Sequence, residues 1–60
     1  MSLSPRQEEV AALMALGLTN RQIAAQLGIA YATVKVHASA IYARLGVATR
    51  TQAALRLAQS

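Results

Sequence analysis

Three glycines divide this chain into four stretches, and this punctuation constrains the possible folds more than any other feature of the sequence. Gly17, Gly28 and Gly46 each follow a stretch whose apolar residues recur at helical spacing. Glycine readily adopts the left-handed conformation in which many helices end. The chain also contains no Phe or Trp, which favour strands, and only one Pro. The sequence therefore predicts an all-α fold of four helices.

Three of the predicted helices share one start signal. A Ser or Thr that can accept a hydrogen bond from the first turn is followed three residues later by a Gln that can reach back to it, which is the pattern of a capping box. The pairs are Ser4 with Gln7, Thr19 with Gln22, and Thr49 with Gln52. These signals predict helices over about residues 5–16, between residues 19 and 28, and from residue 49 to near residue 58.

The longest predicted helix, about Tyr31–Leu45, lacks that start signal. Ala30 occupies its cap position and offers no side-chain acceptor to the N–H groups of the first turn. Those donors need either water or a ligand such as a phosphate, and the sequence leaves both open. Apolar residues at helical spacing define the expected core in the first three helices: Val10, Leu13, Met14, Leu16, Ile23, Ala24, Leu27, Val34, Ala38, Ile41 and Leu45.

The charged residues are unevenly distributed. The formal net charge is +4, and both carboxylates lie next to each other, at Glu8 and Glu9. No carboxylate follows Glu9 in the sequence, whereas five cations do: Arg21, Lys35, Arg44, Arg50 and Arg56. This distribution fits a polyanionic partner, but it also fits an ordinary solvated surface. Charge alone leaves these two interpretations open.

The length allows a single domain over residues 1–60, and a domain this small buries about 60% of the surface that its unfolded chain exposes. There is no cysteine, so no disulfide or thiolate zinc site can form, and a reducing cytoplasm fits. The apolar run Val10–Leu18 is much shorter than the roughly 20 residues that span a bilayer, and Glu8 and Glu9 do not fit a signal peptide. We expect a soluble cytoplasmic protein.

Only Gly28, Ile29 and Ala30 join the second and third predicted helices. Two helices joined by such a short turn form the geometry of a DNA-binding helix-turn-helix, in which the second helix enters the major groove. Other helical hairpins share this spacing, so the surface chemistry has to agree. The face opposite the apolar stripe of residues 31–45 carries mostly small side chains: Ala32, Lys35, Val36, Ser39, Ala40 and Ala43.

Three residues of this face are predicted to contact bases. Lys35 can donate to guanine O6 or N7, Ser39 can hydrogen-bond several base edges, and Val36 can touch thymine methyl groups. Residue types that bind phosphate oxygens flank this face and open the preceding helix. We expect the ring of Tyr42 to lie mainly over the edge of the core. The predicted phosphate contacts are Thr19, Asn20, Arg21, Thr33, Tyr42 and Arg44.

Residues for catalysis or for a metal are lacking in this sequence. His37 is the only histidine, and without Cys or a second His it cannot form a metal site. The two carboxylates are adjacent in the first helix, so no set of Ser, His and acid is available for nucleophilic catalysis. We expect no enzymatic activity, no metal and no cofactor.

These residues resemble a known family. The similarity is carried by residues 3–6, 9–10, 17–24, 27–29, 33–37, 41–42, 45–47 and Arg50, with Thr-Val-Lys-Val-His at 33–37 as the most specific run. The chain resembles the LuxR-type (FixJ/NarL/GerE) helix-turn-helix domain of bacterial transcription regulators. That resemblance implies a four-helix fold of the winged-helix-like superfamily without the wing, with the recognition helix at about residues 31–45.

The resemblance also implies partners. Such domains usually form the C-terminal output module of a regulator, behind a phosphorylatable receiver or a small-molecule-binding domain. They bind double-stranded DNA as dimers in the bacterial cytoplasm, associated with the nucleoid, and RNA polymerase is a further expected partner. In the family, positions matching Lys35, Val36 and Ser39 face bases, while those matching Thr33 and the start of the preceding helix meet phosphate. The chain would be an output module or a stand-alone regulator of the GerE kind.

Two other functions stay open at this point. The promoter-reading domain of sigma factors has a similar Thr-Val-Lys core but usually continues with Ser-Arg. A helical protein-interaction module would have no role on DNA. The chain also departs from the family pattern, because Gln7 and Gln22 stand where Glu is common and Ala30 stands where Ser or Thr is common. We therefore expect its DNA sequence preference to be weakly encoded.

The last predicted helix carries more apolar surface than one core-facing stripe needs. Ala53, Ala54 and Leu57 form one arc that can face the core. A second arc extends well past it and can face another copy of the chain, although Leu55 also fits an ordinary exposed leucine. The resemblance, which implies binding as a dimer, favours the first interpretation. The predicted dimer contact consists of Thr51, Leu55 and Ala58.

Overall fold

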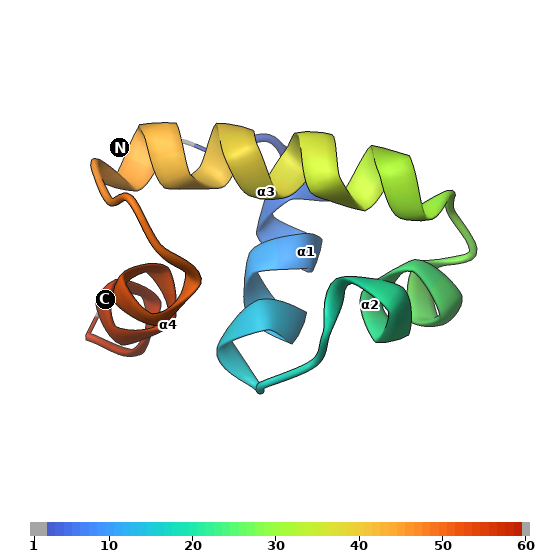
Figure 1. Ribbon diagram of the computed structural model, residues 1–60, viewed down its shortest axis with the longest axis horizontal. Helices are drawn as coiled ribbons and strands as arrows, with labels where there is room; N and C mark the ends of the chain where they lie inside the picture. The colour runs from blue at the N-terminus through green and yellow to red at the C-terminus, as the bar shows by residue number, and fades with distance from the viewer. Residues whose placement is uncertain (1–2, 60) are drawn as a thin grey trace.

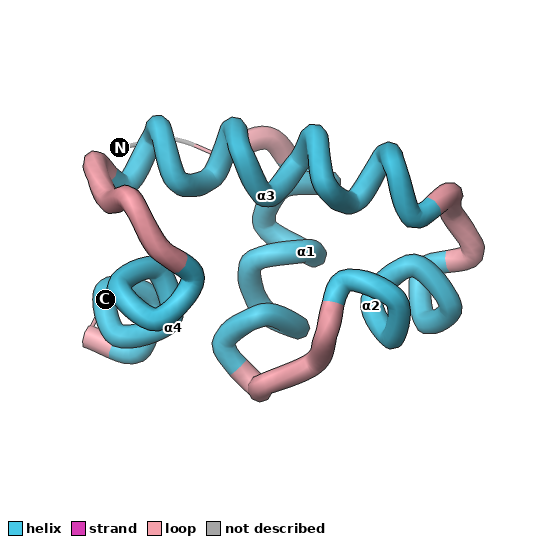
Figure 2. The backbone as a smooth tube through the Cα atoms, in the orientation of Figure 1, coloured by secondary structure: helices cyan, strands magenta, loops and turns pink. Residues whose placement is uncertain are grey.

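The computed structural model describes residues 3–59, which form four helices joined by short loops (Figure 2). The helices are α1 (Pro5–Ala15), α2 (Asn20–Leu27), α3 (Tyr31–Leu45) and α4 (Arg50–Ala58). No strand occurs within the described part of the chain. The fold is therefore all-α, as predicted, and the bounds of α3 are those expected from the sequence.

The three predicted capping boxes are all present. The hydroxyl oxygens of Ser4, Thr19 and Thr49 each accept a hydrogen bond from the backbone N–H three residues on, at 3.1 to 3.2 Å. The Gln at that third position accepts from the backbone N–H of the cap residue in each case. At the start of α3, Ala30 makes no side-chain capping bond. These local signals account for where α1, α2 and α4 begin.

Helix α3 lies across the other helices, with α2 below its N-terminal end and α4 below its C-terminal end (Figure 1). Helix α1 packs against all three, whereas the backbones of α2 and α4 do not approach each other closely. The core lies between α1, α2 and α3, and Ala53 closes it from α4. Its buried residues are Val10, Ala11, Met14, Ile23, Ala24, Val34, Ala38, Ile41 and Ala53.

Two side-chain placements expected from the sequence are wrong. Leu16 is 76% exposed, because α1 ends at Ala15 and a residue two positions after Met14 points away from the buried stripe. Leu18, beyond the glycine turn, packs against the core instead. Ala40 is half-buried rather than exposed, because it lies roughly 100° around the helix from the buried Ile41.

Helix α4 braces the helix-turn-helix pair through two arginines. Arg50 Nη1 donates to Asn20 Oδ1 at 2.7 Å, and Nη2 donates to the carbonyl of Leu18 in the loop before α2. Arg56 Nη1 donates to the carbonyl of Leu45, the last residue of α3, at 3.1 Å. A carbonyl at a helix C-terminus has no partner within its own helix, so Arg56 satisfies a group that would otherwise need water. The start of α2 and the end of α3 are thus both tied to α4.

Candidate nucleic-acid interface

The turn between α2 and α3 is short and closely hydrogen-bonded. Gly28 ends α2 in the left-handed conformation, with φ +67° and ψ +36°, which glycine adopts without a Cβ penalty. Its N–H and that of Ile29 donate to the carbonyl of Ala24. Ile29 packs against the core, and the carbonyl of Ala30 accepts from the first turn of α3. The turn therefore holds α3 at a set angle to α2, as a helix-turn-helix requires.

The outer face of α3 presents the residues predicted to contact bases. Val34, Ala38 and Ile41 are buried against α1 and α2, so the opposite side of α3 faces solvent. Lys35, Val36 and Ser39 are all exposed there, and Val36 is 68% exposed despite its apolar side chain. Ala32 and Ala43 are exposed beside them. The structure brings these side chains together on one narrow face of α3.

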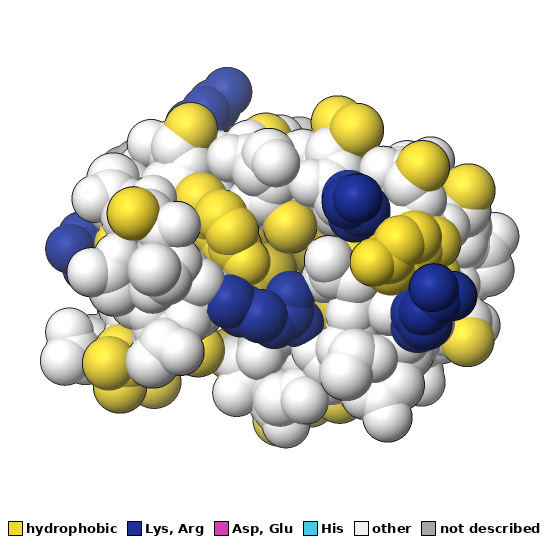
Figure 3. All heavy atoms as spheres, viewed as in Figure 1, with side chains coloured by type: hydrophobic (Ala, Val, Ile, Leu, Met, Phe, Trp, Pro, Cys, Tyr) yellow, Lys and Arg dark blue, Asp and Glu magenta, His cyan; other side chains and the backbone are white. Residues whose placement is uncertain are grey.

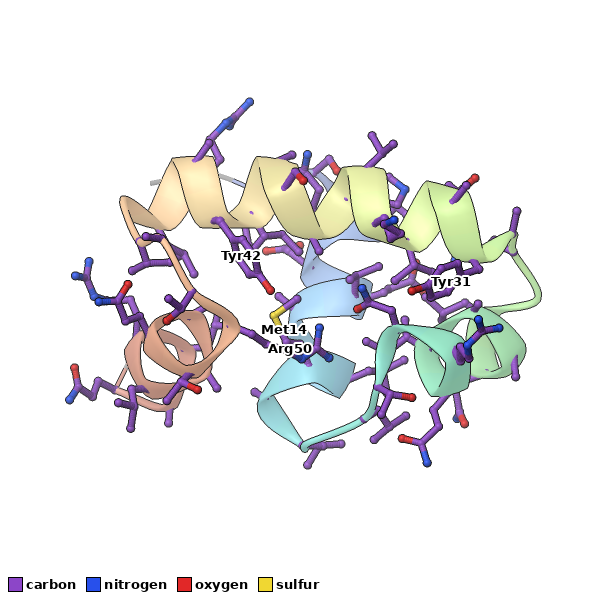
Figure 4. The ribbon with its side chains drawn as sticks, in the orientation of Figure 1. Met14, Tyr31, Tyr42 and Arg50 are labelled. Carbon is purple, nitrogen blue, oxygen red and sulfur yellow. The ribbon has the colours of Figure 1, made fainter. Side chains whose placement is uncertain are left out.

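A cluster that the sequence did not predict lies where α2 meets the start of α3. The guanidinium carbon of Arg21 lies 4.7 Å from the centroid of the Tyr31 ring, and Lys35 Nζ lies 5.6 Å from it. Figure 4 shows Tyr31 between the first turn of α3 and α2. The sequence alone assigns no role to Tyr31, because its contact with Arg21 depends on how α2 and α3 pack. We call these three residues the corner cluster.

The predicted phosphate contacts fall into three environments. Arg21, Thr33 and Arg44 are exposed, but Thr33 and Arg44 lie eleven positions apart on α3, roughly 16 Å along its axis. Thr19 caps α2, while Asn20 accepts a hydrogen bond from Arg50. Both still have donors to offer, because a hydroxyl and an amide NH₂ each keep a proton for another partner.

Tyr42 differs from the other phosphate candidates. It is half-buried and packs against the core, and Figure 4 shows its ring directed from α3 toward Met14. This placement agrees with the expectation that the ring covers the core edge. Only its hydroxyl group is then available for a polar contact.

Arg50 is a further residue at this surface, to which the sequence assigned no contact. Together with Thr19, Asn20, Arg21 and Tyr31 it lines a shallow depression at the start of α2. Its guanidinium group donates to neutral oxygen atoms, so its charge is not cancelled by these bonds. In the sequence, Arg50 is recognisable only as the residue after the cap of α4. Its contact with α2 depends on the tertiary fold.

The charges around this surface are of one sign. Both acidic residues belong to α1, where Glu9 pairs with Arg6 at 3.4 Å in an exposed contact. Figure 3 shows Lys and Arg side chains and no acidic side chain on the face that includes the corner cluster. A cationic surface without nearby carboxylates attracts a polyanion and raises its local concentration.

Helix α4 presents a second, apolar surface. Ala53 is fully buried and Ala54 and Leu57 are partly buried, as expected for the core-facing arc. The predicted dimer residues are on the other side: Leu55 is 60% exposed, and Thr51 and Ala58 are exposed as well.

Within residues 3–59, no group of three or more His, Cys, Asp or Glu side chains is placed to hold a metal ion. None of the described helices combines the length and the hydropathy that crossing a membrane requires.

The chain is similar to known proteins over most of its length. Residues 1–57 match the GerE family model, described as bacterial regulatory proteins of the luxR family. The chain is 46% identical over 56 residues to the putative HTH-type transcriptional regulator YhjB of Escherichia coli K12, covering 93% of this chain and 28% of that protein. It is 51% identical over 55 residues to the two-component response regulator PprB of Pseudomonas aeruginosa, covering 92% and 20%.

A solved structure shares the fold. The crystal structure of the response regulator ChrA, from a heme-sensing two-component system, superposes with a TM-score of 0.90 and 46% sequence identity. The alignment covers 98% of this chain and 29% of that chain. The chain thus spans less than a third of the length of each of these three proteins.

Proposed function

The chain belongs to the luxR family of bacterial regulatory proteins and is a helix-turn-helix DNA-binding domain of bacterial transcription regulation, and on that premise we propose how it reads DNA. Helix α3 enters the major groove with Lys35, Val36 and Ser39 toward the bases. One observation supports this assignment above the others: the outer face of α3 is exposed and built of small side chains, with a cation at its centre. Small side chains let the helix approach the base edges closely.

Phosphate contacts hold the domain in register. We assign them to Thr19, Asn20 and Arg21 at the start of α2, and to Thr33, Tyr42 and Arg44 on α3. The start of α2 contributes the positive end of a helix dipole in addition to these side chains. Such contacts position a protein on the duplex but carry no sequence information directly.

Helix α4 makes the contact between two copies of the domain on adjacent half-sites. Thr51, Leu55 and Ala58 are exposed and offer a small apolar surface. A contact this small is well below the standard interface size, so the DNA itself assembles the dimer. The domain acts without catalysis, as the output part of a regulator, and RNA polymerase is its further partner on the promoter.

Duplex binding by the purified 60-residue chain tests this function. Selection from a pool of random duplexes should yield a preferred sequence. Titrations of that duplex at rising salt should show an affinity that falls linearly on logarithmic axes, because phosphate contacts release counterions. A helical protein-interaction module would bind neither the selected nor a scrambled duplex. Binding that shows no dependence on salt or on sequence would contradict the proposal.

A further inference from the structure

The aromatic ring of Tyr31 contacts a cationic side chain from each helix of the helix-turn-helix, Arg21 from α2 and Lys35 from α3. Tyr31 is the first residue of α3 and 41% exposed, too open to be a core residue. Lys35 follows it by four positions, so the two side chains lie on the same face of α3. Arg21 reaches the ring from α2. Both cations lie within about 6 Å of the ring centroid, the range in which a cation is attracted to an aromatic face.

The group that lies beside these two cations is an aromatic ring and not a carboxylate. Within the described residues neither Arg21 nor Lys35 forms an ion pair, and the acidic side chains are on α1. Lys and Arg side chains have many rotamers, and binding has to restrict them. A carboxylate would restrict them as well, but it would also repel a phosphate and cancel their charge. An aromatic ring restricts them while leaving both charges available to DNA.

We propose that Tyr31 is a positioning residue, and that its ring holds Lys35 ready for a base edge and Arg21 ready for a phosphate. This inference rests on the proposed DNA binding. The two cations have different tasks in that function, and they belong to different helices. A shared ring couples their positions before the duplex arrives. Ordering a side chain in its bound conformation beforehand raises affinity without adding a contact.

Two substitutions separate the ring from its hydroxyl group. Tyr31→Phe keeps the ring, and we expect its affinity for the selected duplex to stay within about twofold of wild type. Tyr31→Leu keeps an apolar side chain but removes the ring, and we expect about a fivefold loss. In a Lys35→Ala background the same Tyr31→Leu change should cost less, because one of the two cations is already gone. Urea unfolding of each variant checks that the fold is retained.

Three results would overturn the proposal. Tyr31→Leu could bind the selected duplex as tightly as wild type, which would leave the ring without a role. Equal losses in Tyr31→Phe and Tyr31→Leu would assign the role to the hydroxyl group, as a direct phosphate contact. Full additivity between Tyr31→Leu and Lys35→Ala would show that Tyr31 does not act through Lys35.

Proton NMR of the free chain gives a readout that does not depend on DNA. An aromatic ring shifts protons above its face to lower frequency. We expect such shifts for the ε-methylene of Lys35 and the δ-methylene of Arg21 in wild type and in Tyr31→Phe, and their loss in Tyr31→Leu. Their absence in wild type would refute the role of Tyr31 even if the chain binds DNA. Shifts present in a chain that binds no duplex would instead refute the proposed function, and with it the role of the ring in binding.

Discussion

Helices α3 and α4 differ in how their first turns are capped. Helix α4 is fixed at its start, where the Thr49 box caps it and Arg50 bonds to α2 and to the loop before it. Helix α3 is fixed at its end, where Gly46 terminates it and Arg56 bonds to the carbonyl of Leu45. Its start has no side-chain cap. The helix assigned to DNA thus has its open end beside the corner cluster, while α4 serves as the brace.

The outer faces of α3 and α4 also differ, and this supports different roles for the two helices. The outer face of α3 offers a cation among small side chains, whereas the outer face of α4 offers an exposed leucine. The first suits a polyanion with grooves and the second suits another apolar surface. If the roles differ in this way, substitutions on the two faces will affect different measurements.

The largest expected effect comes from Leu55→Glu on α4. Leu55 is 60% exposed, so folding and binding to a single half-site should be nearly unchanged. Cooperative binding to a duplex with two half-sites should be abolished, a loss of about 100-fold in apparent affinity, because linked binding depends on the protein contact. Gel-shift titrations on one-site and two-site duplexes measure both quantities.

The matched control for this change is Leu16→Glu, which places the same charge at another exposed leucine, on the side of α1. It should retain cooperativity. Retained cooperativity in Leu55→Glu itself would show that this face of α4 is not the dimer contact.

Lys35→Ala tests the other face. We expect a loss of about 1 to 3 kcal/mol on the selected duplex and little change on a scrambled one, because a contact to a base edge is removed. Fluorescence titrations against both duplexes give the ratio of the two affinities. If Lys35→Ala lowers the affinity for both duplexes equally, Lys35 contacts phosphate and the assignment to bases is wrong.

The open start of α3 can be closed by Ala30→Ser. The hydroxyl group would accept from an N–H of the first turn, so the free energy of unfolding should rise by about 0.5 to 2 kcal/mol. Urea unfolding measures the change. Ala25→Ser, in the exposed middle of α2, is the matched control and should not stabilise, because Ser is a poorer helix former than Ala. An unchanged midpoint in Ala30→Ser would mean that water already satisfies these donors as well as a cap does.

The smallest effect is expected from Arg21→Ala. Binding to selected and scrambled duplexes should weaken alike, by a few fold. The slope of the logarithm of the binding constant against the logarithm of the salt concentration should become shallower by roughly one unit. Arg6→Ala on α1, which removes a cation already paired with Glu9, should leave the slope unchanged. A loss confined to the selected duplex would place Arg21 against a base rather than a phosphate.

The sequence predicts those parts of the molecule that depend on neighbouring residues. The capping boxes, the glycine terminations and the uncapped start at Ala30 are all local features, and the structure confirms them. Leu16 is apolar but exposed, because its position around α1 points away from the buried stripe, and apolar character alone does not reveal this. The exposed face of α3 was predictable from helical periodicity, apart from Ala40 at its edge.

The remaining features depend on contacts between helices. Arg50 and Asn20 are 30 positions apart, and Arg56 and Leu45 are 11 apart, so no local pattern connects them. The same is true of Arg21 and Tyr31, whose contact exists only because the turn at Gly28 brings α2 and α3 together. A long flexible side chain has too many possible partners for the sequence to select one.

We propose that the outer face of α3 is the surface that reads DNA. Amide chemical shifts of the labelled chain, recorded during titration with a single selected half-site, test it most directly. We expect the largest changes at Lys35, Val36 and Ser39 and at the start of α2, with little change around Leu55 on α4. Changes concentrated on α4 or on the Glu8–Glu9 side of α1, with the outer face of α3 unaffected, would contradict it.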